Sequence, residues 1–330
     1  MNITLHMMDK NDIELARHLA PREELVKLTL AKHRGLLAID TDDMVPAGIM
    51  ICSYVRADHL DIEWLFVHEN YRNNEIGEEL LIAAYDMAMK AKIPYVGVRM
   101  AGELAADENV ERAADYFVAR GFYRGTYVEG DWIMSAAKLN DSPLASGKYR
   151  LKNVFPISKA SRADLRVFLQ KNWKKLKQSP LYTYESAMQD MDQDLSMVCV
   201  NGDGEIEDIL LVQRAGDIVY PLAIHMSHVS QKIFLGLATG LTDAAKSLSD
   251  DLIYHIVYSK RAASLMVKIF NSYVAVPTYL MLAPADFYEH EKEDMESGGV
   301  GPYDYMNSFH LQISGKYDFA GYEFHGVRYD

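Results

Sequence analysis

The sequence predicts an α/β protein of two domains, in which the second half repeats the strand and helix order of the first. The chain has 330 residues, and a length of this size favours two domains rather than one. Hydrophobic residues make up 49 % and charged residues 25 % of the chain, the usual balance for a folded globular protein. A segment rich in turn formers, from Asn140 to Gly147, separates the two halves.

In the first half, strands are predicted where residues alternate or where β-branched and aromatic residues cluster, and helices where apolar residues recur at helical spacing. The predicted strands span residues 2–8, 35–40, 46–55, 61–67 and 95–100, with further strands after Gly121. The predicted helices span residues 10–17 and 22–33, a long stretch from Ile76, and residues 109–119.

The second half shows the same order of elements. Strands are predicted at residues 149–157, 196–200, 207–213, 218–225, 252–257 and 273–282, and helices from Ser161, at 230–248 and at 261–270. The sequence therefore predicts domains over residues 1–140 and 148–283, joined by a linker at 141–147. Residues 284–330 form an acidic, tyrosine-rich extension with one expected strand at 309–313.

Composition and charge exclude several classes of function. The formal net charge is −13, which argues against nucleic acid as a partner, because such proteins neutralise phosphates with clustered Lys and Arg. The basic run from Lys171 to Lys177 is interpreted as a solvated helix end. No apolar run is long enough to cross a bilayer, and the N-terminus lacks the pattern of a signal peptide. Cys52 and Cys199 stand in apolar stretches and are expected to be buried thiols. We expect a cytoplasmic protein without a membrane partner or a metal, and a homodimer is compatible with the sequence.

The stretch from Asp61 to Leu81 is predicted to form a strand, a polar loop and the start of a helix. A helix start presents unpaired amide donors and partial positive charge, which suit a phosphate group. The stretch resembles the GNAT acetyltransferase family, whose members carry Leu/Val-x-Val, then Tyr-Arg-Gly-x-Gly-x-Gly and a leucine-bearing helix. The matching residues are Leu65, Phe66, Val67, Tyr71, Arg72, Ile76, Gly77, Leu80 and Leu81. A second stretch, from Ala113 to Phe122, is similar to the family's Ala-x-x-x-Tyr-x-x-x-Gly-Phe.

The resemblance implies a fold class and a cofactor. It implies an α+β-type α/β fold of two tandem GNAT-like domains, each with a mixed, mostly antiparallel sheet flanked by helices. It also implies acetyl-CoA or another acyl-CoA as co-substrate, with the main chain at Leu65 to Val67 pairing with the pantetheine arm. The implied cofactor-binding set is Leu65, Phe66, Val67, Arg72, Asn73, Asn74, Glu75, Ile76, Gly77 and Phe117.

Two departures from the family pattern fall in the loop. Glu75 replaces the central glycine and Glu78 follows Gly77, so carboxylates stand where phosphates would bind and repel them. In the alternative interpretation Asn74 caps the helix while Glu75 and Glu78 complement its dipole, which satisfies the helix start without a ligand.

The catalytic residues are expected to be Glu63 and Tyr116. The family's tyrosine, which protonates the leaving thiolate, corresponds to Phe117, with Tyr116 one residue earlier. Tyr116, Tyr123 or a water molecule would then supply the proton. Glu63 precedes Leu65 by two residues on the predicted strand, so it is expected on the same face. There, a partly buried carboxylate with a raised pKa would act as the general base for an amine. The alternative is an exposed glutamate on the strand face.

The second half carries a weaker form of the same pattern. Phe234 and Gly236 stand at the central and last glycine positions of the loop, and Met266 stands at the tyrosine position. This half is interpreted as a degenerate repeat that shapes the acceptor site. His225 and His228 are interpreted as a strand-end pair rather than metal ligands, and Trp173, Tyr182 and Tyr184 as packing residues.

The predicted function is transfer of an acyl group, most simply acetyl from acetyl-CoA, to an amine on a small molecule or a peptide. An acidic surface favours a cationic acceptor. Tandem members of the family also take aminoacyl groups from tRNA, but the acidic balance disfavours that activity. The alternative from another class is a GNAT-fold binding or assembly module that has lost CoA.

Overall fold

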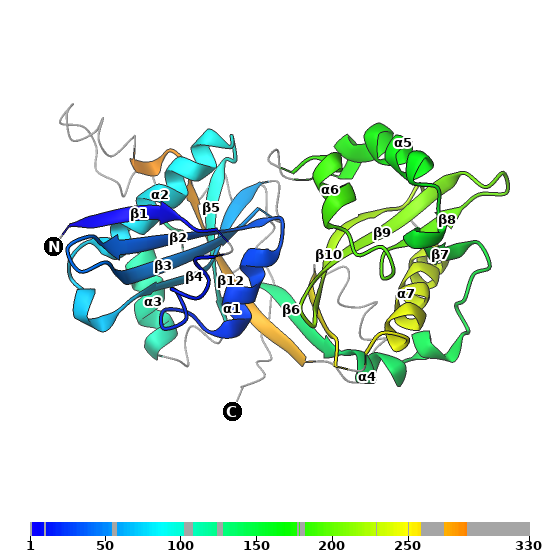
Figure 1. Cartoon of the computed structure of the whole chain (residues 1–330), viewed down its shortest axis with the longest axis horizontal. Coiled ribbons are helices and arrows are strands. Elements are labelled where there is room, and N and C mark those ends of the chain that lie inside the picture. The colour runs from blue at the N-terminus through cyan, green and yellow to red at the C-terminus, as the bar shows by residue number, and fades with distance from the viewer. Residues whose placement is uncertain are drawn as a thin grey trace. The chain divides into compact units, whose positions relative to one another are not determined.

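The computed structural model describes residues 2–9, 11–54, 58–101, 108–123, 128–176, 178, 182–228, 230–249, 251–258 and 274–288. The chain forms two compact units (Figure 1). Within the described residues, the first unit contains residues 2–128 and 277–288, and the second contains residues 129–178 and 182–276.

The first unit is built on a mixed sheet. Its strands lie in the order β1 (Ile3–Met7), β2 (His33–Asp40), β3 (Val45–Ser53), β4 (His59–Val67), β5 (Tyr95–Ala101) and β12 (Val274–Pro284). All neighbouring strands are antiparallel except β4 and β5, which are parallel. The helical elements are α1 (Arg22–Val26), η1 (Lys27–Thr29), η2 (Glu69–Tyr71), α2 (Ile76–Lys90) and α3 (Glu108–Val118).

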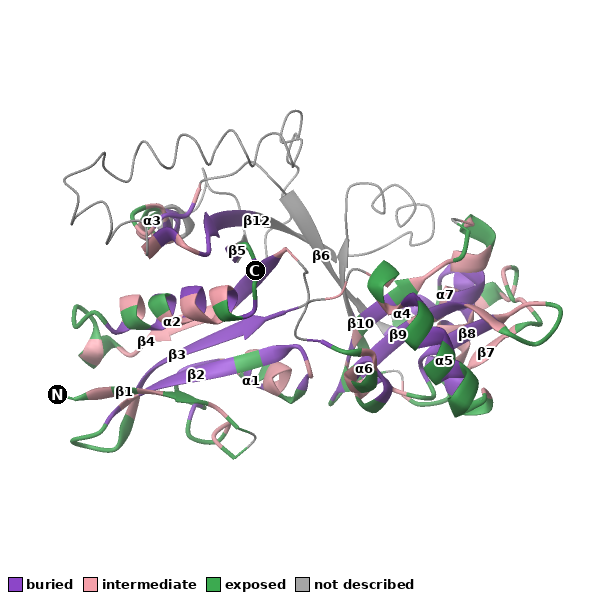
Figure 2. Cartoon of the chain, turned by 90° about the horizontal axis from the view of Figure 1, so that it is seen from above, coloured by how far each residue is buried: buried purple, intermediate pink, exposed green. Residues whose placement is uncertain are grey.

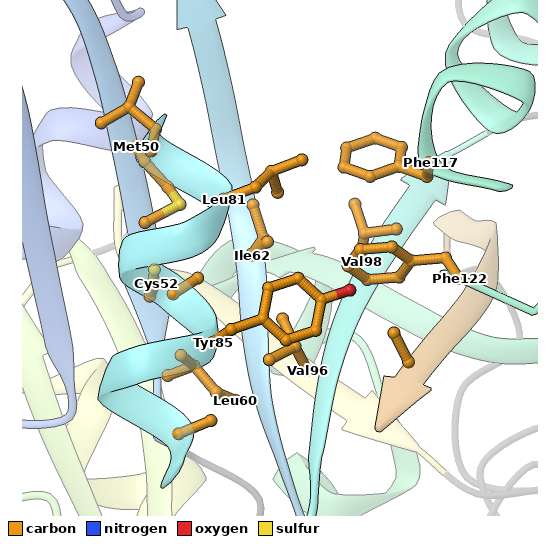
Figure 3. Packing of buried hydrophobic residues seen from close by; sticks show 14 of the residues in the cluster. Met50, Cys52, Leu60, Ile62, Leu81, Tyr85, Val96, Val98, Phe117 and Phe122 are labelled. Carbon is orange, nitrogen blue, oxygen red and sulfur yellow. The ribbon is translucent and has the colours of Figure 1, made fainter. Parts of the chain in front are cut away.

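Hydrophobic clusters cover both faces of this sheet. Buried residues follow β2 and β3 along most of their length, whereas α2 alternates buried and exposed residues, as an amphipathic helix on a sheet should (Figure 2). On the face of α2 and α3, Tyr85 packs edge-on against Phe122 at 5.9 Å between ring centroids, with Leu81 and Ile62 beside them (Figure 3). On the other face Leu37, Ile49 and Ile51 pack against Leu25 of α1.

Two irregularities in β4 shape the first unit. The strand pairs with β5 only from His59 to Ile62, although it continues to Val67. The two parallel strands therefore part after Ile62. On the β3 side, Ile51 pairs with Trp64 and Cys52 with Ile62, so Glu63 is the extra residue of a β-bulge. A bulge bends the strand and changes the faces on which the following side chains lie.

The second unit repeats this plan. Its strands lie in the order β6 (Val128–Ser135), β11 (Ile253–Tyr258), β10 (Ile218–His225), β9 (Ile206–Ala215), β8 (Met197–Val200) and β7 (Val154–Pro156). Its helical elements are α4 (Ala136–Asn140), η3 (Pro143–Ser146), η4 (Ile157–Lys159), α5 (Arg162–Asn172), η5 (Trp173–Leu176), α6 (Tyr184–Asp190) and α7 (Gln231–Lys246). The parallel strands β10 and β11 pair only at Ile218 and Val219 of β10, so they part early, as β4 and β5 do.

The units do not follow the boundaries expected from the sequence. Strand β6, which the sequence assigns to the first domain, pairs with β11 of the second unit. Conversely, β12 pairs with β5 of the first unit, and residues 277–288 belong to that unit. The segment 141–147 contains η3, in which Leu144 is buried, so it is a packed element rather than an open linker.

Most predicted elements of both halves are present, but some differ. The strand expected at residues 149–157 is a strand only over Val154–Pro156, because η4 begins at Ile157. The helix expected at residues 10–17 is wrong, since residues 11–19 form a series of turns with hydrogen bonds such as Leu15 N–H to Asp12 O. The helix expected over 22–33 ends at Thr29, because β2 begins at His33. The helix expected at 261–270 and the strand at 309–313 lie outside the described residues. None of the helices that the structure describes is long and apolar enough to span a membrane.

Candidate functional site

A cavity of about 540 Å³ lies in the first unit where β4 has parted from β5. It is formed by the end of β4, the loop that follows, the start of α2 and one side of α3. Its lining residues are Leu65, Phe66, Val67, Tyr71, Arg72, Asn73, Glu75, Ile76, Gly77, Glu78, Ala113, Tyr116, Phe117 and Arg120. The structure thus brings together Tyr116 and every residue of the expected cofactor set except Asn74.

The loop before α2 keeps a backbone shape that glycine favours. Asn73 has φ 64° and Glu75 has φ 60°, both in the left-handed region. These two residues occupy the first two glycine positions of the family loop. Asparagine adopts this conformation readily, but for glutamate it costs about 1–2 kcal/mol. The loop therefore has the glycine-type backbone, with strain at Glu75.

The start of α2 has no side-chain cap from its own N-cap residue. Glu75 is the N-cap, and its side chain makes no capping hydrogen bond. The interpretation that Asn74 caps the helix is wrong, because its Nδ2 donates to the main-chain oxygens of Tyr71 and Arg72, at 3.3 Å each. The Glu78 and Glu79 amides both donate to the Glu75 main-chain oxygen at 2.9 Å. The amides of Ile76 and Gly77, which line the cavity, are therefore the potential donors to an anion at this helix start.

Two arginines balance the two glutamates at this helix start. Arg72 donates from Nε to the Val67 main-chain oxygen at 3.3 Å, which holds it along the end of β4. Arg120 lies 3.5 Å from Glu78 Oε2 and donates to the Tyr116 main-chain oxygen at 3.1 Å. Its buried Nε has no hydrogen-bond partner among the described residues. A guanidinium group beside a helix start fits a phosphate group.

Arg120 is a site residue that the sequence did not indicate. It precedes Gly121 and Phe122 in the second matching stretch, so its place just after α3 follows from the motif. Its approach to the start of α2 depends on how α3 packs, which no local pattern encodes.

The Tyr116 side chain lies against the start of α2. A Cβ atom placed on Gly77 would lie 2.7 Å from the Tyr116 hydroxyl oxygen, so the absence of a side chain at Gly77 makes room for this hydroxyl. The Arg120 guanidinium lies 3.9 Å from the centre of the Tyr116 ring, a cation–π contact that fixes the ring. Burial raises the pKa of the Tyr116 hydroxyl despite the nearby Arg120, so the group is a neutral donor at pH 7.

Phe117, at the family's tyrosine position, forms an apolar wall of the cavity. It is 7 % exposed and packs against Phe122 at 5.2 Å between ring centroids. It has no proton to donate. Tyr123 pairs through its backbone with Leu282 and is not part of the cavity lining.

Glu63 does not lie where the sequence argument expected. Leu65 packs in the cluster on the α2 face, but the bulge turns Glu63 to the face of α1, so the expectation of a shared face is wrong. Its carboxylate lies 3.0 Å from Lys27 Nζ and 3.3 Å from His33 Nε2. Burial would raise the pKa of the Glu63 carboxyl, but the electrostatic effects of His33 and Lys27 prevail and hold it well below its ordinary value. The raised pKa expected of a general base is therefore also wrong.

The corresponding helix start in the second unit is closed. Ser230 is the N-cap of α7 and its hydroxyl accepts from the Ile233 amide. A Cβ atom on Gly236 would lie 2.5 Å from Leu151 Cδ1, so Leu151 covers this position. Phe234 packs against the buried cluster of the unit. Met266 lies outside the described residues. The second loop therefore lacks the open helix start that the first presents.

The remaining sequence motifs are His225 and His228, the two cysteines and a set of aromatic residues. No group of three His, Cys, Asp or Glu side chains gathers as metal ligands among the residues that the structure describes. Both cysteines are buried, as expected, and burial raises the pKa of the Cys199 thiol to about 11. Trp173 and Tyr182 pack together at 5.9 Å between ring centroids, as the sequence predicts.

Comparisons with known proteins agree with this geometry. Residues 6–122 match the acetyltransferase (GNAT) family. A tandem GNAT protein from the clavulanic acid biosynthesis pathway shares the fold with a TM-score of 0.54 at 11 % identity, over 86 % of this chain and 99 % of that one. A GCN5-related N-acetyltransferase from Sphaerobacter thermophilus gives a TM-score of 0.53 at 11 % identity, over 86 % and 96 % of the two chains.

A third structure extends the likeness to a larger protein. It is the GCN5-related glucosamine N-acetyltransferase region of a fungal multi-domain GH3 β-N-acetylglucosaminidase, with a TM-score of 0.59 at 13 % identity. The match covers 85 % of this chain and 38 % of the fungal protein. No curated protein matches the chain. At these identities the likeness concerns the fold, which is that of two GNAT domains in one chain.

Proposed function

We propose that this chain, which belongs to the GNAT superfamily in its tandem form, transfers an acetyl group from acetyl-CoA to an amine. Membership of this superfamily supports acyl transfer as the general activity of the chain. The observation that carries the finer proposal is the cavity at the parted end of β4, where an unpaired strand edge meets a helix start without a side-chain cap. A strand edge and a helix start are the two backbone features suited to an amide-bearing arm and a phosphate.

The donor site would be held mainly by backbone. The main chain of Leu65 to Val67 would pair with the amide-bearing arm, and the amides from Arg72 to Gly77 would surround the phosphates. Arg120 and the Tyr116 hydroxyl add donors at the same helix start. When bound, acyl-CoA would supply the activated thioester. Tyr116 is thus proposed as a phosphate-binding group rather than the proton donor, since its hydroxyl lies beside Gly77.

Glu63 is proposed to stabilise the bend of β4 rather than to accept the proton. A carboxylate held in ion pairs with a lowered pKa is a weak base, and an ideal general base has a pKa near the working pH. The acceptor is proposed to be a cationic amine on a small molecule or peptide, because the net charge of −13 attracts cations. The second unit, with its closed helix start, is proposed to shape the acceptor site.

A binding module that has lost acyl-CoA is the second candidate. It is favoured by Glu75 and Glu78 at the phosphate position and by Phe117, which cannot protonate a thiolate. Catalysis and binding can be separated experimentally, because binding requires only the helix start and strand edge.

The test is calorimetric titration with acetyl-CoA, followed by an assay of thiol release with a panel of amines. Arg120→Ala should weaken acetyl-CoA binding by about tenfold or more, because a charge-assisted hydrogen bond contributes about 1.5–3 kcal/mol. Arg150→Ala is the matched control, since Arg150 is paired with Asp243 in the second unit, and it should leave the affinity unchanged. Binding without thiol release for any amine would favour the module. Failure of the wild type and of Glu75→Gly to bind acetyl-CoA would refute the cofactor proposal.

A further inference from the structure

A second cavity, of about 560 Å³, lies within the second unit. It brings together two motifs that the proposed function does not use. One is the basic run at the end of α5, represented by Lys171 and Lys175. The other is the end of β10, from Ile224 to Ser227. We propose that this cavity is a separate binding site for a small carboxylate with an apolar body.

One wall of the cavity is cationic. Lys171 and Lys175 are four residues apart, so they lie on the same side of the continuous helical segment formed by α5 and η5. Lys175 Nζ donates to Asn172 Oδ1 at 3.1 Å, which directs the ammonium along this wall. Both lysines line the cavity. This wall is therefore positively charged, although the chain as a whole has a net charge of −13.

Acidic side chains on the facing wall offset part of the positive charge of the two lysines. Glu207 lines the cavity, and its Oε1 lies 3.2 Å from the Ser227 hydroxyl. Asp208 lies behind, fully buried, where its Oδ1 accepts from the Ser227 amide at 2.6 Å. Burial and Lys175 lower the pKa of the His225 imidazole, so this ring is neutral at pH 7. Among the lining side chains, two lysines and one glutamate leave one unit of positive charge. The buried Asp208 behind them reduces it further, so a monovalent carboxylate suits the cavity better than a divalent phosphate.

Apolar side chains complete the lining, beside the polar Asn172, His225 and Ser227. Phe168 packs edge-on against the His225 ring at 5.4 Å between centroids. Ile224 is 41 % exposed, which is high for a branched aliphatic residue on a strand, and it faces the cavity with Ile206 and Met226. A ligand that combines a carboxylate with an aliphatic or aromatic body would satisfy both parts of the lining.

This cavity is distinct from the acyl-CoA position of the repeat. That position would lie at the start of α7, where Ser230 caps the helix and Leu151 covers Gly236. No residue of α7 lines the cavity. The second unit would therefore have lost one type of site while presenting another.

The experiment is calorimetric titration of the full chain with sodium hexanoate, sodium benzoate and sodium phosphate at constant ionic strength. Hexanoate or benzoate should bind in the millimolar range or tighter, and more tightly than phosphate. The double variant Lys171→Ala/Lys175→Ala should weaken carboxylate binding at least about tenfold, because two charged partners are lost. Lys174→Ala removes the same charge from the same turn outside the lining and should have no effect.

Glu207→Gln should have the opposite effect on affinity. Removing this carboxylate should tighten the binding of hexanoate and benzoate severalfold. Weaker binding in this variant would indicate a cationic ligand and would overturn the proposal. Phosphate binding as tight as that of benzoate, or no binding of either carboxylate by the wild type, would also overturn it. The thermal midpoint of each lysine variant should match the wild type, because the lysines are exposed.

Discussion

We expect the charge of Glu75 to lower the affinity of this helix start for a phosphate. Its side chain is exposed and lines the cavity from the N-cap position of α2. Two like charges about 4 Å apart repel by about 1 kcal/mol in water and by more where water is partly excluded. We therefore expect Glu75→Gly to tighten acetyl-CoA binding by about 1–2 kcal/mol, which corresponds to about five- to thirtyfold.

The same substitution should change stability little. Glycine removes the cost of about 1–2 kcal/mol that a left-handed φ imposes on glutamate. Two losses oppose this gain: glycine adds about 0.5–1 kcal/mol of chain entropy to the unfolded state, and the favourable interaction of Glu75 with the helix dipole disappears. The free energy of unfolding from urea denaturation should therefore stay within about 1 kcal/mol of the wild type.

Two further substitutions separate charge from backbone strain. Glu75→Asn removes the charge and tolerates the left-handed conformation, so it should tighten binding as Glu75→Gly does. Glu75→Asp tolerates the same conformation but keeps the charge, so its affinity should equal that of the wild type. If Glu75→Asn bound acetyl-CoA no more tightly than Glu75→Asp, the charge of Glu75 would not control the affinity.

Three other predictions concern stability. Gly121 has φ 86°, and a Cβ atom there would lie 2.5 Å from the Phe287 ring, so Gly121→Ala should destabilise by about 2–4 kcal/mol in urea denaturation. Gly202→Ala, where nothing lies within 4 Å, should be nearly neutral, and equal effects would contradict the prediction. Asp61 and Asp58 overcome the effect of burial and raise the pKa of His59 to about 9, so its stabilisation is complete below pH 6.5 and is lost as the pH rises through 9. Between pH 6.5 and 8 the wild type should lose about 1–2 kcal/mol relative to His59→Gln, whereas parallel profiles would exclude a charged His59. Glu63→Gln should cost about 3 kcal/mol, because it leaves the largely buried Lys27 without one of its carboxylates. Adding Lys27→Met should recover part of this loss, and strictly additive effects in the double-mutant cycle would contradict the ion pair.

Much of the fold was predictable from the sequence because its signals are local. Helix α2 has a regular apolar stripe, and it begins at Ile76 as predicted. Strand β10 spans Ile218–His225, as the alternation and flanking turns indicate. The exchange of β6 and β12 between the two units was not predictable, because the choice of a neighbouring strand depends on the whole sheet. The same holds for residues 11–19, where a helical pattern gives way to turns.

In the candidate site, too, the local features were predictable and those that depend on packing were not. A short motif predicts the loop, so the sequence placed Arg72, Glu75 and Gly77 together with the end of β4. It misplaced Glu63, because a bulge breaks the alternation on which the argument depended. It also missed Arg120, which reaches the loop only through the packing of α3.

Hydrogen–deuterium exchange with and without acetyl-CoA tests the central claim most directly, because it reports on individual backbone segments. We predict slower exchange in peptides covering residues 65–67 and 72–79 when acetyl-CoA is added, with no change over residues 230–237 at the start of α7. Protection over residues 230–237 but not over residues 72–79 would contradict the assignment of the donor site to the first unit. Unchanged exchange in both segments at saturating acetyl-CoA would contradict the proposed cofactor.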